Sequence, residues 1–318
     1  MVRKLSVLVT GANGFIGRRL LRKLRDQKNV FVRCLVRKPS EKTSVLCRDV
    51  RIGDLRDSAS IDGVAEGIDV VFHLATTGDI NATSEKAYDE YRINNVEGTK
   101  NLLEECSRSG VKKFVHFSSV AVYGDIKRNI IVTEKTPCKP LAPYQKTKYE
   151  SERLVLEYCR KHKINAVVLR PSTVYGGRDR SDIRKLDKFM KLGAVPIIGD
   201  GRNLVHMVHV DDLAETAIKV AEPGRKGGVY LVNTESISLN DIIFVLGKNR
   251  KFIKINIPVN LVKFALGFAE PVAKKIGLTL PINLSRIESF STDTKLETKL
   301  AERELDFHPK RLFKDHTY

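Results

Sequence analysis

Near its N-terminus the chain reads Leu5-Ser-Val-Leu-Val-Thr10-Gly11-Ala-Asn-Gly14-Phe-Ile-Gly17. The apolar run before Gly11 predicts a buried strand, and the apolar positions after Gly14 recur at helical spacing. Glycines at such a junction permit a tight turn and a close approach of the backbone to a ligand, and the N-terminus of the next helix favours an anion. The glycines therefore predict a turn that holds the pyrophosphate of a dinucleotide, with further contacts from Asn13, Phe15 and Ile16.

Outside this turn, short apolar runs alternate with helix-like stretches such as Asn95–Cys106 and Lys148–Lys161. This alternation predicts an α/β fold, a Rossmann-type doubly wound parallel sheet. Glycines and prolines interrupt the pattern after Arg170. We therefore expect a dinucleotide-binding domain over 1–171, with a returning segment at about 204–233, and a smaller C-terminal substrate-binding lobe over 172–203 and 234–318. The further apolar runs are Val30–Val36, Val50–Ile52, Val70–Leu74, Phe114–Phe117, Ala166–Leu169 and Val229–Val232.

The composition is that of a globular protein with a basic excess. Its 318 residues include 56 Lys and Arg against 38 Asp and Glu, a net charge of +18, and 42% are hydrophobic, which excludes an intrinsically disordered chain. The basic residues are dispersed, with acidic residues between them and no aromatic-flanked basic motif. We therefore expect no nucleic-acid partner, and solvated helix faces rather than an anionic partner for most of the surplus, apart from a phosphorylated small-molecule substrate.

Compartment and metal content follow from what the sequence lacks. No apolar run approaches the roughly 18 residues of a membrane span, and Leu5–Val9 is too short for a signal peptide. The five cysteines are odd in number and at least 13 positions apart, which fits neither a zinc site nor a disulfide framework. We expect a cytoplasmic protein with reduced thiols and no metal.

The second apolar run ends in positive charge. In dinucleotide-binding folds an acidic residue about 20 positions after the glycines binds the ribose 2′-hydroxyl, whereas an arginine accommodates a 2′-phosphate. Arg37 stands there with Lys38 beside it, and no Asp or Glu occurs between Val30 and Ser40. Because a guanidinium binds a phosphate and a carboxylate repels it, we expect NADP to be preferred, with NAD as the alternative.

Tyr144 and Lys148 stand four residues apart, so both side chains project from one face of a helix. An unperturbed phenol has a pKa of about 10, and a neighbouring cation lowers it by stabilising the phenolate. The pair predicts a general acid/base for an alcohol or ketone. Upstream, Ser118 and Ser119 follow an apolar run, and a serine hydroxyl there can donate a hydrogen bond to the substrate oxygen.

Taken together, these motifs resemble the extended short-chain dehydrogenase/reductase family, in its NAD(P)-dependent epimerase/dehydratase group. The order and spacing of the matching pieces cover most of the chain. The resemblance implies an enzyme that moves a hydride between nicotinamide C4 and a carbinol or ketone carbon. The pieces are Gly11–Gly17, Gly53–Leu55, His73–Ala75, Asn94–Thr99, Ser118–Ser119 with Val122–Gly124, Tyr144 with Lys148, Leu169–Pro171 and His209–Leu213.

The same resemblance implies the catalytic roles. Ser119 is the catalytic serine, with Ser118 as second choice, and Tyr144 is the acid/base. Lys148 lowers the pKa of that phenol and holds the nicotinamide ribose, while Asn95 supports the lysine and its water. These assignments predict a Ser-Tyr-Lys triad with a supporting asparagine.

Contacts with the cofactor beyond the glycine turn are implied in the same way. Asp54 and Leu55 flank the adenine, and Ala75 lies near the pyrophosphate and ribose. Leu74 and Pro171 are further contacts of this kind. The segment His209–Leu213 is structural in the family, so no chemistry is expected of its histidine and aspartates.

Three departures from the family pattern narrow the reaction. Val120-Ala121 stand where 4,6-dehydratases carry Asp-Glu, which argues against dehydration. Thr173 replaces an asparagine of many sugar-nucleotide epimerases, and Val205 replaces the arginine that grips the substrate diphosphate. Arg202 and Arg178 are the expected substitutes for that arginine, with Arg180 and Arg184 as further candidates.

Three functions stay open. The first is a 4-epimerase or 4-ketoreductase of a nucleotide-diphosphate sugar that contacts Ser119, Thr173, Arg178 and Arg202. The second is an NADPH-dependent reductase or dehydrogenase of a lipophilic or phenolic ketone, resembling dihydroflavonol reductases or 3β-hydroxysteroid dehydrogenases. The third is a non-catalytic NADPH-binding subunit, which an intact triad disfavours. Family members often form dimers, so a homodimer is a further open expectation.

One apolar stretch, Val259–Glu270, bears on the choice between substrates, with Lys263, Lys274 and Lys275 in or near it. The favoured interpretation is a helix of the substrate lobe packed on the core. Peripheral contact with an anionic membrane surface, or a lipophilic pocket, is the alternative.

Overall fold

The computed structural model describes residues 4–124, 130–176, 182–222, 227–276, 278, 280, 284, 287 and 294–315. Its centre is a seven-stranded sheet with the strand order β3-β2-β1-β4-β5-β7-β11, in which every neighbouring pair is parallel. These seven strands coincide with the seven apolar runs of the sequence, so the predicted doubly wound parallel sheet is confirmed. The strands are β1 Leu5–Thr10, β2 Val30–Val36, β3 Asp49–Ile52, β4 Val70–His73, β5 Lys113–Phe117, β7 Asn165–Pro171 and β11 Gly228–Val232.

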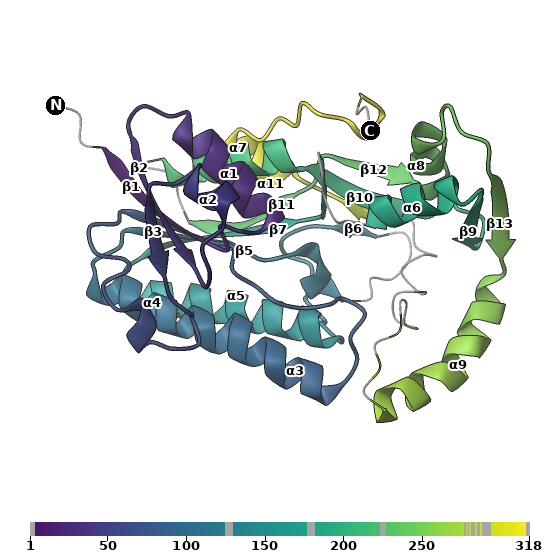
Figure 1. The fold of residues 1–318 in the computed structure, drawn as a ribbon, viewed down its shortest axis with the longest axis horizontal. Coiled ribbons are helices and arrows are strands. Elements are labelled where there is room, and N and C mark those ends of the chain that lie inside the picture. The colour runs from purple at the N-terminus through teal and green to yellow at the C-terminus, as the bar shows by residue number, and fades with distance from the viewer. Residues whose placement is uncertain are drawn as a thin grey trace.

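Helices cover both faces of the sheet (Figure 1). On one face, side chains of α1, α7 and α11 such as Leu20, Leu213 and Leu305 form a core with the strands. On the other face, Leu102 of α4 and Val155 of α5 form the second core, and α3 packs against α5. The helices are α1 Phe15–Arg25, α2 Glu41–Ser44, α3 Glu85–Arg92, α4 Gly98–Arg108, α5 Pro143–Lys161, α7 Val210–Ala221 and α11 Lys299–Leu305.

Helix α5 begins at Pro143, earlier than the predicted Lys148. Proline suits the first turn because its missing N–H would have no partner there. The side-chain oxygen of Gln145 accepts hydrogen bonds from the backbone N–H groups of Leu141 and Ala142, at 2.9 and 3.1 Å. This cap fixes the start of the helix, so Tyr144 lies in its first turn.

The chain after Arg170 is more regular than the sequence indicated. It forms a three-stranded sheet of order β12-β10-β8 and a parallel pair of β13 with β9, and β14 pairs with β6. Within 204–233, β10 belongs to the three-stranded sheet, whereas β11 joins the central sheet. The division into two domains stays a prediction. The elements are β6 Ile131–Val132, β8 Thr173–Tyr175, α6 Asp182–Lys191, β9 Ala194–Ile198, β10 Leu204–His209, β12 Glu235–Ser238, α8 Leu239–Leu246, β13 Ile253–Ile257, α9 Val259–Lys275 and β14 Lys295–Leu296.

The sheet extends in both directions from β1, which has β2 on one side and β4 on the other. In open α/β sheets, ligands bind at the carboxyl ends of the strands flanking such a switch point. Here those ends are Thr10 with Gly11, after β1, and Leu74 with Ala75, after β4. The topology therefore places the glycine turn where a dinucleotide binds.

Candidate active site

The glycine turn packs tightly against the end of β4. Gly11 has φ +68°, and a Cβ built on it would lie 2.7 Å from the backbone nitrogen of Ala75. A Cβ on Gly17 would collide with the carbonyl oxygen of Gly11. The N–H of Gly14 bonds that same oxygen at 2.9 Å, and α1 starts immediately after Gly14. Only glycines fit this turn, and the geometry fits a pyrophosphate resting on the N-terminus of α1.

The side chain of Asn13 turns toward the loop after β2 instead of pointing freely into solvent. Its amide nitrogen donates to the carbonyl of Lys38 at 2.9 Å, and its oxygen accepts from the hydroxyls of Ser40 and Thr43, at 2.8 and 2.5 Å. Arg37 and Lys38 are both exposed on this loop. Asn13 thus fixes the backbone that carries the two basic residues predicted to meet the 2′-phosphate.

Asp54 and Leu55 follow β3 and approach the same region. Hydrogen bonding from Arg56 lowers the pKa of Asp54, and the charge of Arg37 contributes a smaller lowering. The carbonyl of Leu55 accepts from the amide of Asn101 at 2.8 Å, which ties this loop to α4. The structure therefore brings Arg37, Asp54 and Leu55 to one end of the sheet, beside the glycine turn.

Two serines after β5 have different partners. The Ser118 hydroxyl is buried and donates to the carboxylate of Glu152 at 2.7 Å. Ser119 lies within hydrogen-bonding reach of the Tyr144 phenol, and its hydroxyl also caps the short helix Val120–Tyr123 by accepting from the N–H of Ala121. Of the two, Ser119 faces the tyrosine.

Burial raises the pKa of Tyr144, and the hydrogen bond from Ser119 offsets part of that rise. Lys148 lies one turn along α5 and is buried, and burial lowers its pKa to about 8 while the charge of Glu152 partly restores it. Its ammonium donates to the carbonyl of Phe117 at 2.5 Å. Among the groups of the protein, the Ser119 hydroxyl and not Lys148 lowers the pKa of the Tyr144 phenol.

Asn95 is buried in a π-helical turn, Ile93–Glu97, at the start of α4. Its oxygen accepts from the N–H of Thr77 at 2.8 Å, and its nitrogen donates to the carbonyl of Thr77 at 2.8 Å and to the hydroxyl of Thr147 at 3.1 Å. Asn95 therefore links the loop after β4 to the residue directly before Lys148. Such π turns are frequent at functional sites.

Sequence reasoning missed three supports of this site. Buried Arg170 of β7 makes an ion pair with Glu152 and donates to the phenol of Tyr123 at 2.7 Å, which fixes α5 against the sheet. Buried His73 bonds the hydroxyls of Thr10 and Thr99, each at 2.8 Å, and joins β1 and β4 to α4. Gly78, with φ +152°, lies against the Tyr144 ring. These links join residues far apart in the chain, so no local pattern signals them.

The residues predicted to contact the substrate lie at several separate places in the chain, and some of them lie outside the described residues. Pro171 is buried at the end of β7, and Thr173 is exposed two residues later. Arg202 is exposed before β10 and has Asp200 at 3.7 Å. Arg178 and Arg180 lie outside the described residues, as does the side chain of Arg184. Val205 of β10 pairs with Ile237 of β12 and offers no charge for a diphosphate.

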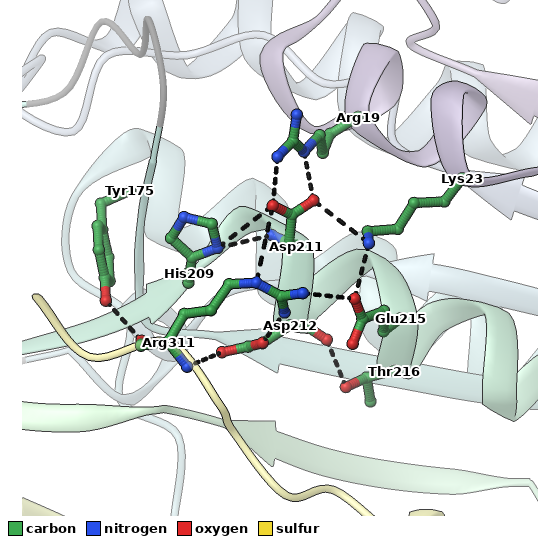
Figure 2. A network of polar contacts seen from close by, with 9 residues as sticks. All are labelled: Arg19, Lys23, Tyr175, His209, Asp211, Asp212, Glu215, Thr216 and Arg311. Atoms are coloured by element: carbon green, nitrogen blue, oxygen red, sulfur yellow. Dashed lines mark hydrogen bonds and ion pairs between the residues drawn. The ribbon is translucent and has the colours of Figure 1, made fainter. Parts of the chain in front are cut away.

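The segment after β10 forms an ion-pair network (Figure 2). The guanidinium of Arg19 of α1 donates to both carboxylate oxygens of Asp211, and the ammonium of Lys23 lies 3.4 Å from the same carboxylate. Arg311, near the C-terminus, bonds Asp212 and also Glu215, the latter at 2.9 Å. The aspartate carboxylates are thus engaged in holding α7 to α1 and to the C-terminal segment.

Two further findings concern the cysteines and the possible metal ligands. All five cysteines are free thiols. In the described part of the chain, no group of three His, Cys, Asp or Glu side chains could hold a metal ion.

The chain is similar to several known proteins. It is 28% identical over 301 residues to N-acetyl-alpha-D-glucosaminyl-diphospho-ditrans,octacis-undecaprenol 4-epimerase of Escherichia coli O157:H7, covering 92% of this chain and 87% of that protein. It is 29% identical over 307 residues to 4-hydroxy-2-methyl-3-oxo-4-farnesyl-3,4-dihydroquinoline-1-oxide ketoreductase of Stigmatella aurantiaca, covering 92% and 90%. The structure of UDP-glucuronic acid 4-epimerase from Bacillus cereus in complex with NAD superposes with a TM-score of 0.75 at 25% identity, covering 98% and 95%.

A family model adds the classification. The model described as the NAD dependent epimerase/dehydratase family matches residues 7–232, which run from β1 to the end of β11. This range holds all of the parallel sheet except the first two residues of β1, together with the glycine turn and all three residues of the expected triad. The chain therefore belongs to the NAD dependent epimerase/dehydratase family of enzymes.

Proposed function

We propose that this enzyme epimerises carbon 4 of a sugar carried on a diphosphate, by reversible hydride transfer with NAD(P). The observation that carries the proposal is the approach of Ser119 to the Tyr144 phenol, with buried Lys148 one helical turn away. A sugar hydroxyl seated between Ser119 and Tyr144 meets one hydrogen-bond donor and one proton acceptor. That is the arrangement needed to convert an alcohol into a ketone and back.

Each residue of the triad has a distinct task in this proposal. Ser119 donates to the reacting oxygen and holds it in place. Tyr144 takes the hydroxyl proton as the carbonyl forms and returns it when the alcohol is regenerated, which requires the phenolate that the positive charge of a bound oxidised nicotinamide would favour. That nicotinamide would accept the hydride of carbon 4 and give it back, so the reaction would involve no net oxidation. The positive charge of Lys148 at neutral pH favours binding of the ribose hydroxyls.

For the cofactor, we propose contacts from the glycine turn, from Asp54 and Leu55, from Leu74 and Ala75, and from Pro171. The solved relative from Bacillus cereus contains NAD, which supports NAD as one cofactor. Arg37 supports binding of the 2′-phosphate of NADP as well, because it is exposed and makes no ion pair within the described residues. Direct titration with NADPH and NADH tests this, since Arg37→Ala should weaken only the binding of NADPH.

The names of similar proteins support a diphosphate-linked sugar as the substrate. One is named as a 4-epimerase of a diphospho-undecaprenol sugar, and the other as a UDP-sugar 4-epimerase. We propose that the lobe made by 172–203 and 234–318 binds this substrate, with Thr173 and Arg202 as contacts and Arg178 as a further one.

A second candidate is net reduction of a lipophilic ketone. Two observations favour it. Val205 offers no charge for a diphosphate, and the Stigmatella relative is named as a ketoreductase of a farnesylated quinoline oxide.

One experiment separates these functions. The purified enzyme is gently denatured, and the released nucleotide is identified by mass spectrometry. It is also incubated with UDP-N-acetylglucosamine, with a polyprenyl-diphosphate sugar and with a farnesylated ketone plus NADPH. Retained NAD and 4-epimerised sugar support the epimerase. Stoichiometric NADPH oxidation with the ketone supports the reductase. Failure of every substrate, with intact nucleotide binding, would favour a non-catalytic subunit.

A further inference from the structure

Helix α9 carries an apolar face that no described part of the chain covers. Leu261, Phe264, Phe268 and Val272 are 59%, 67%, 68% and 60% exposed. Their spacing of three, four and four residues puts them on one side of the helix. The rings of Phe264 and Phe268 meet edge to face, with centroids 5.0 Å apart. Figure 1 shows α9 running from the end of β13, at the end of the molecule opposite the N-terminus.

The opposite side of α9 carries the buried residues of the helix. Leu266 and Ala273 are buried there. That α9 packs on the core stays a prediction, because neither residue belongs to a described hydrophobic core. A contiguous exposed apolar patch like the outer side of α9 marks an interaction surface.

The surroundings of this face are positively charged. Residues 248–276 contain seven Lys and Arg against a single acidic residue, Glu270. The carboxylate of Glu270 accepts a hydrogen bond from the backbone N–H of Leu284, so it is engaged within the chain. Lys251, Lys254 and Lys275 are exposed; the first lies two residues before β13, the second within it and the third in the last turn of α9. Lys275 stands three residues after Val272, so it lies on the same side of α9 as the apolar face.

Strand β13 extends the same pattern. Ile253 and Ile255 are 65% and 46% exposed, and Lys254 lies between them. The lysine Nζ donates to the side chain of Asn240 at 3.2 Å, which holds it beside α8. Because side chains alternate along a strand, Ile253 and Ile255 lie on one face of β13 and Lys254 on the other. Exposed apolar side chains therefore continue from β13 into α9, and the basic and apolar segment that carries them, residues 251–276, is here called the α9 surface.

We propose that the α9 surface docks onto an anionic lipid membrane. Phenylalanine and leucine side chains enter the boundary between headgroups and acyl chains, and lysines lie among the negative headgroups. A second copy of the chain fits less well, because pairing two such faces would bring like charges together. Among the described residues no helix is long and apolar enough to cross a membrane, so the contact is peripheral.

The proposal stands apart from the proposed reaction, because it uses no residue of the catalytic or nucleotide-binding machinery. Its consequence concerns where the enzyme is located. Docking would hold the lobe that contains β9, β13 and α9 at the lipid surface, where a substrate with an acyl or prenyl chain is concentrated.

The test is sedimentation of the full-length enzyme with vesicles. Vesicles of phosphatidylcholine alone are compared with vesicles containing 30% phosphatidylglycerol, whose negative surface attracts basic segments. We expect wild type to bind the anionic vesicles at least ten-fold more tightly. Phe264→Ser combined with Phe268→Ser should weaken that binding at least ten-fold, and Lys251→Glu combined with Lys275→Glu should abolish its dependence on phosphatidylglycerol. A second apolar variant, Leu261→Ser with Val272→Ser, repeats the first test should the phenylalanine variant fail to fold.

The matched control is Val45→Ser with Ile52→Ser. These side chains are 70% and 63% exposed near the nucleotide-binding end of the sheet, far from α9 in sequence. This control should bind like wild type, and nucleotide binding should be equal in all variants. Equal vesicle binding by wild type and both apolar variants would show general adsorption of a protein with charge +18 and would overturn the proposal. Conversion of a dimer to a monomer by the phenylalanine variant, with unchanged vesicle binding, would assign the face to a second copy and overturn it too.

Discussion

Gly78 lies directly against the ring of Tyr144: a Cβ built on Gly78 would stand 2.5 Å from Cδ2 of the tyrosine. The glycine belongs to the loop after β4, which Asn95 holds through Thr77. This loop and α5 therefore set the position of the Tyr144 ring together.

Substitution of Gly78 by alanine should displace the phenol. An added methyl group must push the ring away, and a misplacement of about 1 Å can cost 10²-fold in rate. We expect kcat of Gly78→Ala to fall at least ten-fold, with the Kd for NAD within about three-fold of wild type. Gly67→Ala is the matched control, because Gly67 also has a positive φ, +72°, but has nothing within 4 Å of its would-be Cβ. If both variants lose the same activity, backbone strain rather than the tyrosine contact is responsible.

Removal of the Tyr144 hydroxyl should stop proton transfer and leave binding intact. Tyr144→Phe is expected to lower kcat by about two to four orders of magnitude. Titration with NAD should give a Kd close to that of wild type. Tyr149→Phe, one turn further along the same helix and packed in an apolar cluster, serves as control and should keep full turnover. Normal turnover by Tyr144→Phe would refute its role as the acid/base.

The neighbouring serines should separate chemistry from stability. Ser119→Ala is expected to lower kcat about 10²-fold, because it removes the donor facing the phenol. Its effect on the free energy of unfolding should be only about 1 kcal/mol, from the lost cap of the helix Val120–Tyr123. Ser118→Ala should instead lower the free energy of unfolding by roughly 1.5–3 kcal/mol, since it deprives the buried Glu152 carboxylate of a hydrogen bond. Turnover per folded molecule and urea unfolding give the two readouts, and the reverse pattern would exchange the assignments.

Lys148 should make stability depend on pH in the alkaline range. Burial lowers its pKa in the folded protein to about 8, from an ordinary value of 10.5. Between these values the unfolded chain binds more protons than the folded one, so the free energy of unfolding rises with pH. Relative to Lys148→Met, wild type should gain about 3 kcal/mol between pH 8 and pH 10.5. Urea unfolding of both proteins across this range checks it, and parallel curves would contradict it.

Asp211 should contribute to stability and not to turnover. Its carboxylate is nearly buried and receives Arg19 and Lys23 of α1 (Figure 2). Asp211→Asn should therefore lower the free energy of unfolding by about 2–3 kcal/mol, as expected for loss of one member of a largely buried ion pair. The kcat of the folded fraction should stay near that of wild type. A loss of kcat with unchanged unfolding would assign chemistry to this segment.

The features that could be predicted correctly from the sequence are those that leave a pattern over a few neighbouring residues. Buried parallel strands are continuous apolar runs, so the seven strands of the sheet could be located, and the glycine turn follows from the spacing of Gly11, Gly14 and Gly17. The shared helix face of Tyr144 and Lys148 follows from the helical repeat. The strands after Arg170 were harder to predict, because they are short and their partners are distant, as when β10 pairs with both β8 and β12.

Contacts between distant elements escaped prediction for the same reason. Nothing local indicates that Arg170 meets Glu152, or that Gly78 meets Tyr144. Nor does an apolar stretch tell which of its sides faces water: Phe264 and Leu266 have the same hydrophobic character, yet the first is exposed and the second buried. Composition alone likewise does not show that Asn13 bonds the loop of Lys38.

The return of the chain after α9 has a consequence for how this enzyme can evolve. After β14, helix α11 packs against β11 and α7, and Arg311 bonds Asp212 and Glu215 on α7. The stretch between β12 and β14 therefore leaves the three-stranded sheet and returns to β6 before the chain reaches the central sheet. We expect that related proteins can differ in the length and sequence of this stretch without any change in the central parallel sheet.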